Sequence, residues 1–127
     1  MKKLLCSLFA LSAVSTAMAQ EVNIKLLGTS DIHGRVVPWS YGADVEDKSG
    51  SYAQIATYVK DVRKNNKNVV LVDVGDAIQD NQVDVFAKDK KYYKDHPIPK
   101  VLNEMKYDVF VLGNHEFNFG MEALDEI

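Results

Sequence analysis

Short polar motifs follow three apolar runs of this chain, and this recurrence constrains the fold more than any other feature. Asp31-Ile32-His33 follows the first run, Gly75-Asp76 the second and Gly113-Asn114-His115-Glu116 the third. In an open parallel sheet, the carboxyl ends of neighbouring strands lie along one edge, and ligands bind in the crevice outside them. The sequence therefore predicts a sheet that gathers polar side chains from distant parts of the chain at one edge.

Alternating strands and helices are predicted along the chain. The strand runs are Val22 to Leu27, Val69 to Val72 and Val109 to Leu112, and the second is a continuous β-branched and aliphatic run, typical of a strand buried on both faces. Apolar residues at helical spacing follow a capping box at Ser51 and recur again after Pro97. This order predicts an α/β fold, with a mostly parallel sheet and helices on its faces.

Two connections lack a regular pattern. Residues 34 to 50 are expected to form an irregular loop, and residues 77 to 95 a loop or a short helix. His96, which precedes Pro97, is predicted to help start the second helix.

The two ends of the chain carry patterns of their own. Lys2 and Lys3 precede a short apolar stretch, and Ala17-Met18-Ala19 has the small residues of a cleavage site, so residues 1–19 are predicted to be a secretory signal peptide. The stretch is shorter than the roughly 20 residues that cross a bilayer, which argues against stable membrane insertion; a short membrane anchor is the alternative. A helical pattern begins at Met121 and stops at Ile127, so residues 20–127 are expected to be the N-terminal part of a truncated domain.

Composition excludes two classes of function. The chain has 15 basic and 18 acidic side chains, a net charge of −3, and no clustered basic stripe, so a nucleic-acid polymer is not the expected partner. Cys6, the single cysteine, lies in the predicted signal peptide, which excludes thiol chemistry in the mature protein. A small anionic substrate remains compatible with this charge if metal ions supply the positive field.

The polar motifs contain side chains that bind divalent metals. Asp31 and His33 can offer an oxygen and a nitrogen to one cation, although such a pair can also make loop hydrogen bonds. Gly75-Asp76 is ordinary turn chemistry, and Gly113-Asn114-His115-Glu116 could simply start a helix. Their occurrence together at three successive strand ends favours a metal site.

These motifs resemble the calcineurin-like metallophosphoesterases, whose pattern runs Asp-x-His, Gly-Asp and Gly-Asn-His-Glu or Gly-Asn-His-Asp. The resemblance extends over nearly all of residues 22 to 127. It includes features of the secreted nucleotidase branch, which contains 2′,3′-cyclic-nucleotide 2′-phosphodiesterases and 5′-nucleotidases. The resemblance implies the N-terminal part of a metallophosphoesterase sandwich and an enzyme that hydrolyses small nucleotides in the periplasm or outside the cell.

The same resemblance assigns roles to individual residues. It implies that Asp31 and His33 bind one metal, that Asp76 bridges two metals and that Asn114 binds the second. His115 is implied to be the catalytic residue that faces the substrate phosphate. The cofactor is then two divalent cations, for which mixed oxygen and nitrogen donors allow manganese, zinc, iron or cobalt.

Two neighbours of His115 have further predicted roles. Glu116 is expected to orient His115 or a metal ligand, or else to be an acid that favours the start of a helix. Asn118 stands where the 5′-nucleotidase branch often has an aspartate that orients the histidine, whereas the cyclic-phosphodiesterase branch tends to have asparagine.

Some features of the family are expected downstream of this chain. The family completes its metal site with further histidines, including a Gly-His-x-His motif, and no histidine follows His115 here. The 127 residues alone are therefore expected to bind metal poorly. A secreted metal-containing binding module without turnover and a related thiosulfohydrolase are the alternatives, while the preferred nucleotide and the oligomeric state stay open.

Overall fold

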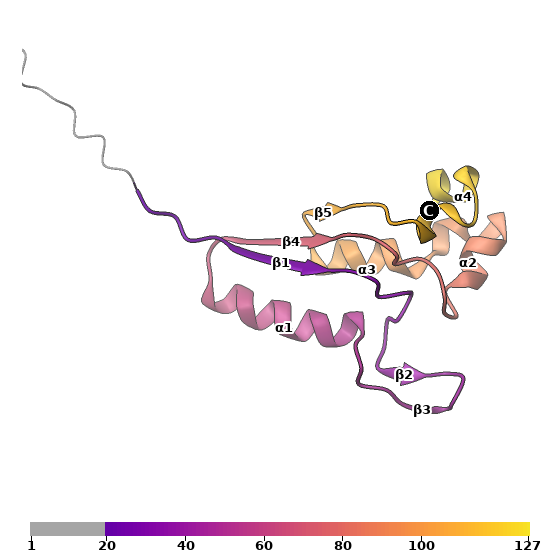
Figure 1. The fold of residues 1–127 in the computed structure, drawn as a ribbon, viewed down its shortest axis with the longest axis horizontal. Coiled ribbons are helices and arrows are strands. Elements are labelled where there is room, and N and C mark those ends of the chain that lie inside the picture. The colour runs from indigo at the N-terminus through magenta and orange to yellow at the C-terminus, as the bar shows by residue number, and fades with distance from the viewer. Residues whose placement is uncertain (1–19) are drawn as a thin grey trace, which may run out of the picture.

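A three-stranded parallel sheet organises the protein, for which the computed structural model describes residues 20–127. The strands are β1 (Lys25–Thr29), β4 (Val69–Asp73) and β5 (Val109–Phe110), in the spatial order β1-β4-β5. Figure 1 shows the strands lying side by side, with their carboxyl ends on one side. The α/β fold with a parallel sheet is thus confirmed, while the predicted signal peptide lies outside the described residues.

Two helices form the crossovers between these strands. The first, α1 (Tyr52–Asn65), connects β1 to β4, and α3 (Pro97–Met105) connects β4 to β5. As predicted, Ser51 caps α1, since its side chain accepts a hydrogen bond from the Gln54 amide. His96 caps α3 in the same way, because its Nδ1 accepts from the Ile98 amide at 3.3 Å. Both predicted helices are therefore confirmed with their starting residues.

The helices cover one face of the sheet. Buried residues from α1, α3 and the loop after β4 form the hydrophobic core, which includes Tyr52, Ile78, Ile98, Leu102 and Met105. Arg63 of α1 donates hydrogen bonds to the carbonyl oxygens of Met105 and Lys106, which joins the ends of the two helices. Side chains alternate between the faces of a strand, and apolar residues on the opposite face are exposed in the described part of the chain: Leu26, Val74, Val109 and Val111.

The first connection contains more regular structure than predicted. Residues 34 to 50, expected to be irregular, include the antiparallel strands β2 (Trp39–Ser40) and β3 (Val45–Glu46). The segment after β4, expected to be a loop or a short helix, contains the short helix α2 (Asp84–Lys88) and a 3₁₀ helix, η1 (Lys90–Asp95). Strands of two residues and a helix of five fall below the length at which sequence periodicity can be recognised.

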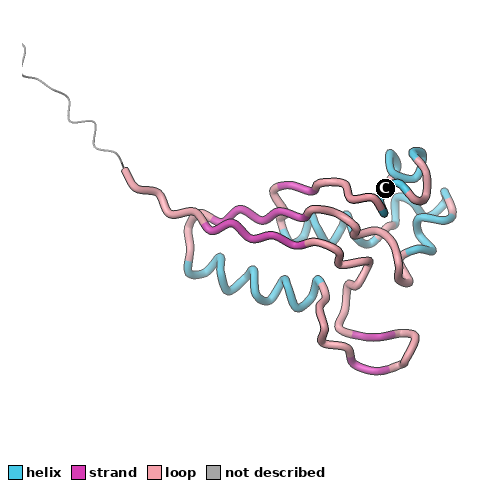
Figure 2. The backbone as a smooth tube through the Cα atoms, viewed as in Figure 1, coloured by secondary structure: helices cyan, strands magenta, loops and turns pink. Residues whose placement is uncertain are grey.

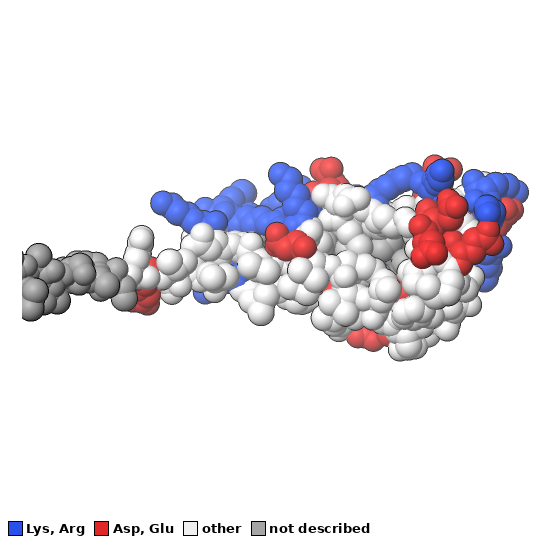
Figure 3. Space-filling model, turned by 90° about the horizontal axis from the view of Figure 1, so that it is seen from above, with Lys and Arg blue, Asp and Glu red and all other residues white. Residues whose placement is uncertain are grey.

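The last part of the chain turns back over the end of the sheet. It forms a 3₁₀ helix, η2 (His115–Phe117), and α4 (Met121–Glu126); Figure 2 shows helical turns in cyan at the C-terminal end of the chain, and α4 contacts η1. Lys90 of η1 pairs with Glu122 of α4, and Figure 3 shows acidic and basic side chains intermingled at this end of the molecule. Within residues 20–127, no helix is both long enough and apolar enough to cross a membrane.

Candidate metal centre

The loops that follow β1 and β4 are bonded to each other beyond the ends of the strands. The amide of Asp31 donates to the Gly75 carbonyl at 3.1 Å, and the amide of His33 donates to the Asp76 carbonyl at 2.9 Å. A third bond joins Gly34 to Ala77 at 2.8 Å. This pairing places the Asp31-Ile32-His33 motif directly beside Asp76.

The loops that follow β4 and β5 approach each other so closely that only glycine fits between them. A Cβ on Gly75 would lie 2.1 Å from the Gly113 nitrogen, and a Cβ on Gly113 would lie 2.3 Å from Asp76 Oδ1. Gly75 also has φ +93°, a left-handed conformation that glycine adopts without steric cost. The two glycines therefore let the third polar motif reach the second.

The buried carboxylate of Glu116 binds both of these loops and holds them together. Its carboxylate is fully buried and accepts backbone N–H bonds from Asp76 at 2.8 Å, Ala77 at 2.7 Å and Gly113 at 2.7 Å. Glu116 lies in the first turn of η2 (His115–Phe117), as one of its two predicted roles required, and its carboxylate binds the backbone of Asp76; its role in orienting a metal ligand stays a prediction.

A second buried carboxylate supports the start of the loop after β4. Asp73 accepts hydrogen bonds from the Thr29 hydroxyl at 2.6 Å, the Gly75 amide at 2.8 Å and the Tyr52 hydroxyl at 3.3 Å. Burial raises the pKa of Asp73 above its usual value, while these hydrogen bonds oppose the rise. Asp73 thus connects β1, α1 and the turn that presents Asp76.

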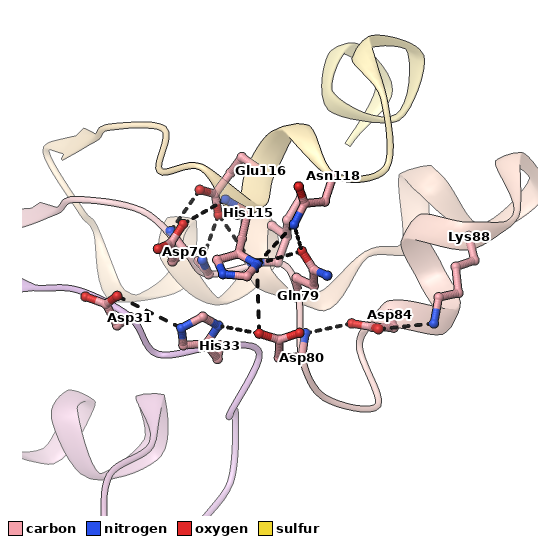
Figure 4. Close-up of polar contacts among 12 residues, drawn as sticks. Asp31, His33, Asp76, Gln79, Asp80, Asp84, Lys88, His115, Glu116 and Asn118 are labelled. Carbon is pink, nitrogen blue, oxygen red and sulfur yellow. Dashed lines mark hydrogen bonds and ion pairs between the residues drawn. The ribbon is translucent and has the colours of Figure 1, made fainter.

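This scaffold brings side chains from all three motifs into one cluster. One potential ligand atom from each of His33, Asp76 and His115 lies within 4.8 Å of the other two. Figure 4 shows the three side chains facing a common space, and the two imidazole rings meet edge to face with centroids 5.0 Å apart. Two imidazole nitrogens and a carboxylate oxygen form a donor set that suits first-row divalent cations.

Asp31 and Asn114 lie at the border of the cluster. Asp31 Oδ1 is 4.0 Å from His33 Nε2, and the Asp31 side chain is 64% exposed. Asn114 is exposed and directly precedes His115 in the chain. The ligand roles of Asp31, His33, Asp76 and Asn114 and the catalytic role of His115 stay predictions.

The backbone of this region is held in an uncommon conformation. Four residues of the cluster or its border have left-handed φ values: Asp31 at +55°, His33 at +48°, Asp76 at +58° and Asp80 at +76°. A non-glycine residue in this conformation costs about 1–3 kcal/mol and persists where the surroundings impose it. Such strain is typical of functional sites, where it aims side chains at a ligand.

Two amides surround His115, and sequence reasoning identified only one of them as a partner. His115 Nδ1 lies 2.8 Å from Gln79 Oε1 and 3.1 Å from Asn118 Nδ2, and Asn118 Nδ2 donates to the same Gln79 oxygen at 2.6 Å. The tautomer of His115 decides which contact is a hydrogen bond: Nδ1 donates to Gln79 Oε1 when it carries hydrogen, and it accepts from Asn118 Nδ2 when it does not. Gln79 carries no local signal of this role, since its partner is 36 residues away.

Asp80 is a second residue that sequence reasoning missed. Its Oδ2 lies 3.2 Å from His33 Nδ1 and 3.9 Å from His115 Nδ1. In the sequence, Asp80 stands between Gln79 and Asn81, which indicates only a polar turn.

Comparison with known proteins identifies the family. Residues 24–126 match the family model of the calcineurin-like phosphoesterases. Over 115 residues, 84% of this chain, the sequence is 40% identical to the trifunctional nucleotide phosphoesterase protein YfkN of Bacillus subtilis. The crystal structure of the calcineurin-like phosphoesterase YfkN superposes on 81% of this chain with a TM-score of 0.73.

The chain is also similar to a cyclic-nucleotide enzyme, and it matches only a part of each relative. It is 37% identical over 123 residues to the 2′,3′-cyclic-nucleotide 2′-phosphodiesterase/3′-nucleotidase of Haemophilus influenzae, which is 93% of this chain. It spans 8% of the length of the Bacillus protein and 19% of the Haemophilus protein, and 33% of the chain in the YfkN crystal structure.

Proposed function

This chain belongs to the calcineurin-like phosphoesterase family, and we propose that it hydrolyses phosphoester bonds of small nucleotides with the help of two divalent cations. The observation that carries this proposal is the convergence of His33, Asp76 and His115 within 4.8 Å from three separate strand ends. The partly exposed carboxylates of Asp31 and Asp80 lie beside this cluster. Such a concentration of negative charge and nitrogen donors is compensated best by cations.

Two cations would divide the proposed ligands between them. Asp31 and His33, which one loop joins, would hold the first cation, and Asn114 would hold the second. Asp76 would be the shared anionic ligand, because two neighbouring cations need a group that offsets their repulsion. Once bound, the cations supply a water molecule of lowered pKa and positive charge for the phosphate oxygens.

His115 transfers a proton in the proposed reaction. Its Nδ1 lies 2.8 Å from Gln79 Oε1, so Nε2 is the atom that faces the reaction: it takes up a proton from solvent and passes that proton to the departing oxygen of the ester. Asn118 donates to the same Gln79 oxygen and thereby keeps the Gln79 amide in the orientation that His115 needs. An amide can orient the imidazole, although it carries no charge of its own.

The names of the relatives support the substrate class. A trifunctional nucleotide phosphoesterase and a 2′,3′-cyclic-nucleotide 2′-phosphodiesterase/3′-nucleotidase both match this chain, and a human 5′-nucleotidase is 33% identical over 128 residues. We assign 2′,3′-cyclic nucleotides and 3′- or 5′-nucleotides as the substrates. The sequence pattern of residues 1–19 supports a place of action outside the cytoplasm.

The test is an assay of the whole protein on 2′,3′-cyclic AMP, 3′-AMP and 5′-AMP, with and without complete removal of metal. Activity should be lost with the metal and return on addition of Mn²⁺.

Asp76→Asn should abolish the activity, since asparagine keeps the left-handed backbone and the oxygen but loses the charge that two cations share. Asp44→Asn is the matched control, because Asp44 has a similar φ of +54° and lies in the turn between β2 and β3. Undiminished turnover without metal, or in Asp76→Asn, would refute the proposal, and metal binding without turnover on any of the three would favour a binding module.

A further inference from the structure

The two nitrogens of His33 face different carboxylates. Nε2 points towards Asp31 Oδ1 at 4.0 Å, on the side of the proposed cation, and Nδ1 faces Asp80 Oδ2 at 3.2 Å. Figure 4 shows the His33 ring lying between these two aspartates. Only one nitrogen of a neutral imidazole carries hydrogen, so the partner of Nδ1 decides whether Nε2 has a lone pair to offer a metal.

Within the described residues, Asp80 is the polar group placed to act on Nδ1. The Nδ1 atom is shielded from solvent and has no partner that meets both the distance and the direction of a hydrogen bond. The Asp80 oxygen meets the distance, and a hydrogen bond requires the two side chains to turn towards each other. A carboxylate accepts and never donates when ionised, so it selects the form of His33 with hydrogen on Nδ1.

The backbone and α2 hold Asp80 in this place. Asp80 has φ +76°, and its amide donates to Asp84 Oδ1 at 2.8 Å. The other oxygen of Asp84 pairs with Lys88 one turn further along α2, at 3.1 Å. The Asp80 carboxylate is therefore carried on a turn that is fastened to a helix, although half of its side chain surface is exposed.

His33 is the better match for Asp80 than its neighbour His115. The distance to His115 Nδ1 is 3.9 Å, and that nitrogen already has Gln79 Oε1 at 2.8 Å. The His33 nitrogen is closer to Asp80 and lacks such a partner among the described residues.

We propose that Asp80 is a positioning residue that keeps hydrogen on His33 Nδ1 and so directs His33 Nε2 towards the cation. This inference rests on the proposed function for the identity of the ligand as a metal. Carboxylates that accept the second N–H of a metal-binding histidine fix its ring and raise its basicity, and their loss weakens metal binding about 10–100-fold.

The first experiment needs no metal and no activity. Nitrogen-15 NMR of the metal-free whole protein, at a pH where His33 is neutral, reports which ring nitrogen carries hydrogen. The wild type should have it on Nδ1, and Asp80→Gly should shift the population towards hydrogen on Nε2. Glycine is chosen because it accepts the left-handed backbone, so a folding defect is not expected. An unchanged distribution in Asp80→Gly would overturn the proposal.

The second experiment measures Mn²⁺ binding by titration calorimetry. Asp80→Gly should weaken the affinity about 10–100-fold, and Asp80→Asn should recover most of it, because the amide oxygen still accepts from Nδ1. Asp44→Gly, at a similar φ outside the site, should match the wild type. Equal losses in Asp80→Asn and Asp80→Gly with an unchanged NMR result would make Asp80 a direct ligand and overturn the positioning role. A wild type that binds no Mn²⁺ would refute the proposed function, while the metal-free NMR result would still decide what Asp80 does to His33.

Discussion

Two layers of polar side chains lie at the carboxyl end of the sheet, and they differ in how their atoms are used. The lower layer, here called the buried support, consists of Asp73, His96 and Glu116, none of which is more than 1% exposed. The upper layer, here called the rim, consists of Asp31, His33, Asp76, Asp80 and His115. Glu116 has both oxygens engaged by backbone amides, whereas Asp31 is 64% exposed.

This difference separates structural roles from ligand binding. Asp73 and Glu116 accept hydrogen bonds from the loops that carry the rim, which holds these loops in place, and His96 caps α3. The rim keeps lone pairs of carboxylates and imidazoles directed at a shared space. Substitutions in the buried support should therefore change mainly the free energy of unfolding. Substitutions in the rim should change mainly the metal affinity and the rate of hydrolysis.

Removing the Glu116 carboxylate should produce the largest loss of stability. Glu116→Ala leaves the amides of Asp76, Ala77 and Gly113 without their acceptor, at about 1–3 kcal/mol for each unsatisfied group. We expect the free energy of unfolding in urea to fall by about 3–5 kcal/mol. Glu122→Ala, on the exposed surface of α4, should leave it nearly unchanged. Similar unfolding curves for both variants would contradict the supporting role of Glu116.

A methyl group at Gly113 should damage the rim with a smaller effect on stability. In Gly113→Ala the new Cβ meets Asp76 Oδ1 at 2.3 Å, so the proposed bridging carboxylate has to move. A displacement of about 1 Å at a catalytic group can cost about 10²-fold in rate. We expect a loss of that order in kcat/KM. Gly42→Ala serves as the control, since no described atom lies within 4 Å of its Cβ, and a wild-type rate in Gly113→Ala would show that the loops can separate freely.

His96 should make the buried support sensitive to acid. Burial lowers the pKa of His96 to about 4 in the folded protein, whereas the unfolded chain has the ordinary value of about 6.5. The unfolded state thus binds the proton more tightly, so stability is complete above pH 6.5 and falls as the pH drops towards 4. We expect a loss of about 2 kcal/mol between pH 7.5 and pH 5 from this group.

Comparison with His96→Asn isolates that contribution. Asparagine also caps helices and does not titrate. The difference between the free energies of unfolding of the wild type and the variant should therefore narrow as the pH falls. Parallel pH profiles of the free energy of unfolding would show that His96 is not the source of the acid sensitivity.

The amide partner of His115 should have the smallest of these effects. Gln79→Ala removes one hydrogen bond to the imidazole, and a bond worth about 1 kcal/mol corresponds to about fivefold in kcat. Asn118→Ala should cost less, because His115 Nδ1 keeps its contact with Gln79. The reverse order of the two variants would indicate that Asn118, and not Gln79, orients His115.

The sequence was most informative about the parts that depend on local patterns. The strand that precedes Asp76, both crossover helices and their caps at Ser51 and His96 follow from periodicity and capping chemistry, and all are present. The first strand begins three residues later than predicted, at Lys25, and the third ends at Phe110, because strand ends depend on pairing with neighbours and not on composition alone.

Long-range partners could not be predicted in the same way. Glu116 binds amides about 40 residues away, and Gln79 reaches His115 over 36 residues. The position of Asp80 depends on a left-handed turn and on its attachment to Asp84, for which Asp-rich turn composition is the only local signal. The sequence therefore predicted that the three motifs meet at the sheet edge, and the contacts that orient their side chains required the fold.

The most direct test of this account starts from the metal-free whole protein. Mn²⁺ is added, the bound ions are counted, and their electron paramagnetic resonance spectrum is recorded. We predict two ions per chain with a spin-coupled spectrum, as expected for centres about 3.5–4 Å apart, and loss of the coupling in Asp76→Asn. A single ion, or two ions without magnetic coupling, would contradict the claim that three strand ends build one two-metal site.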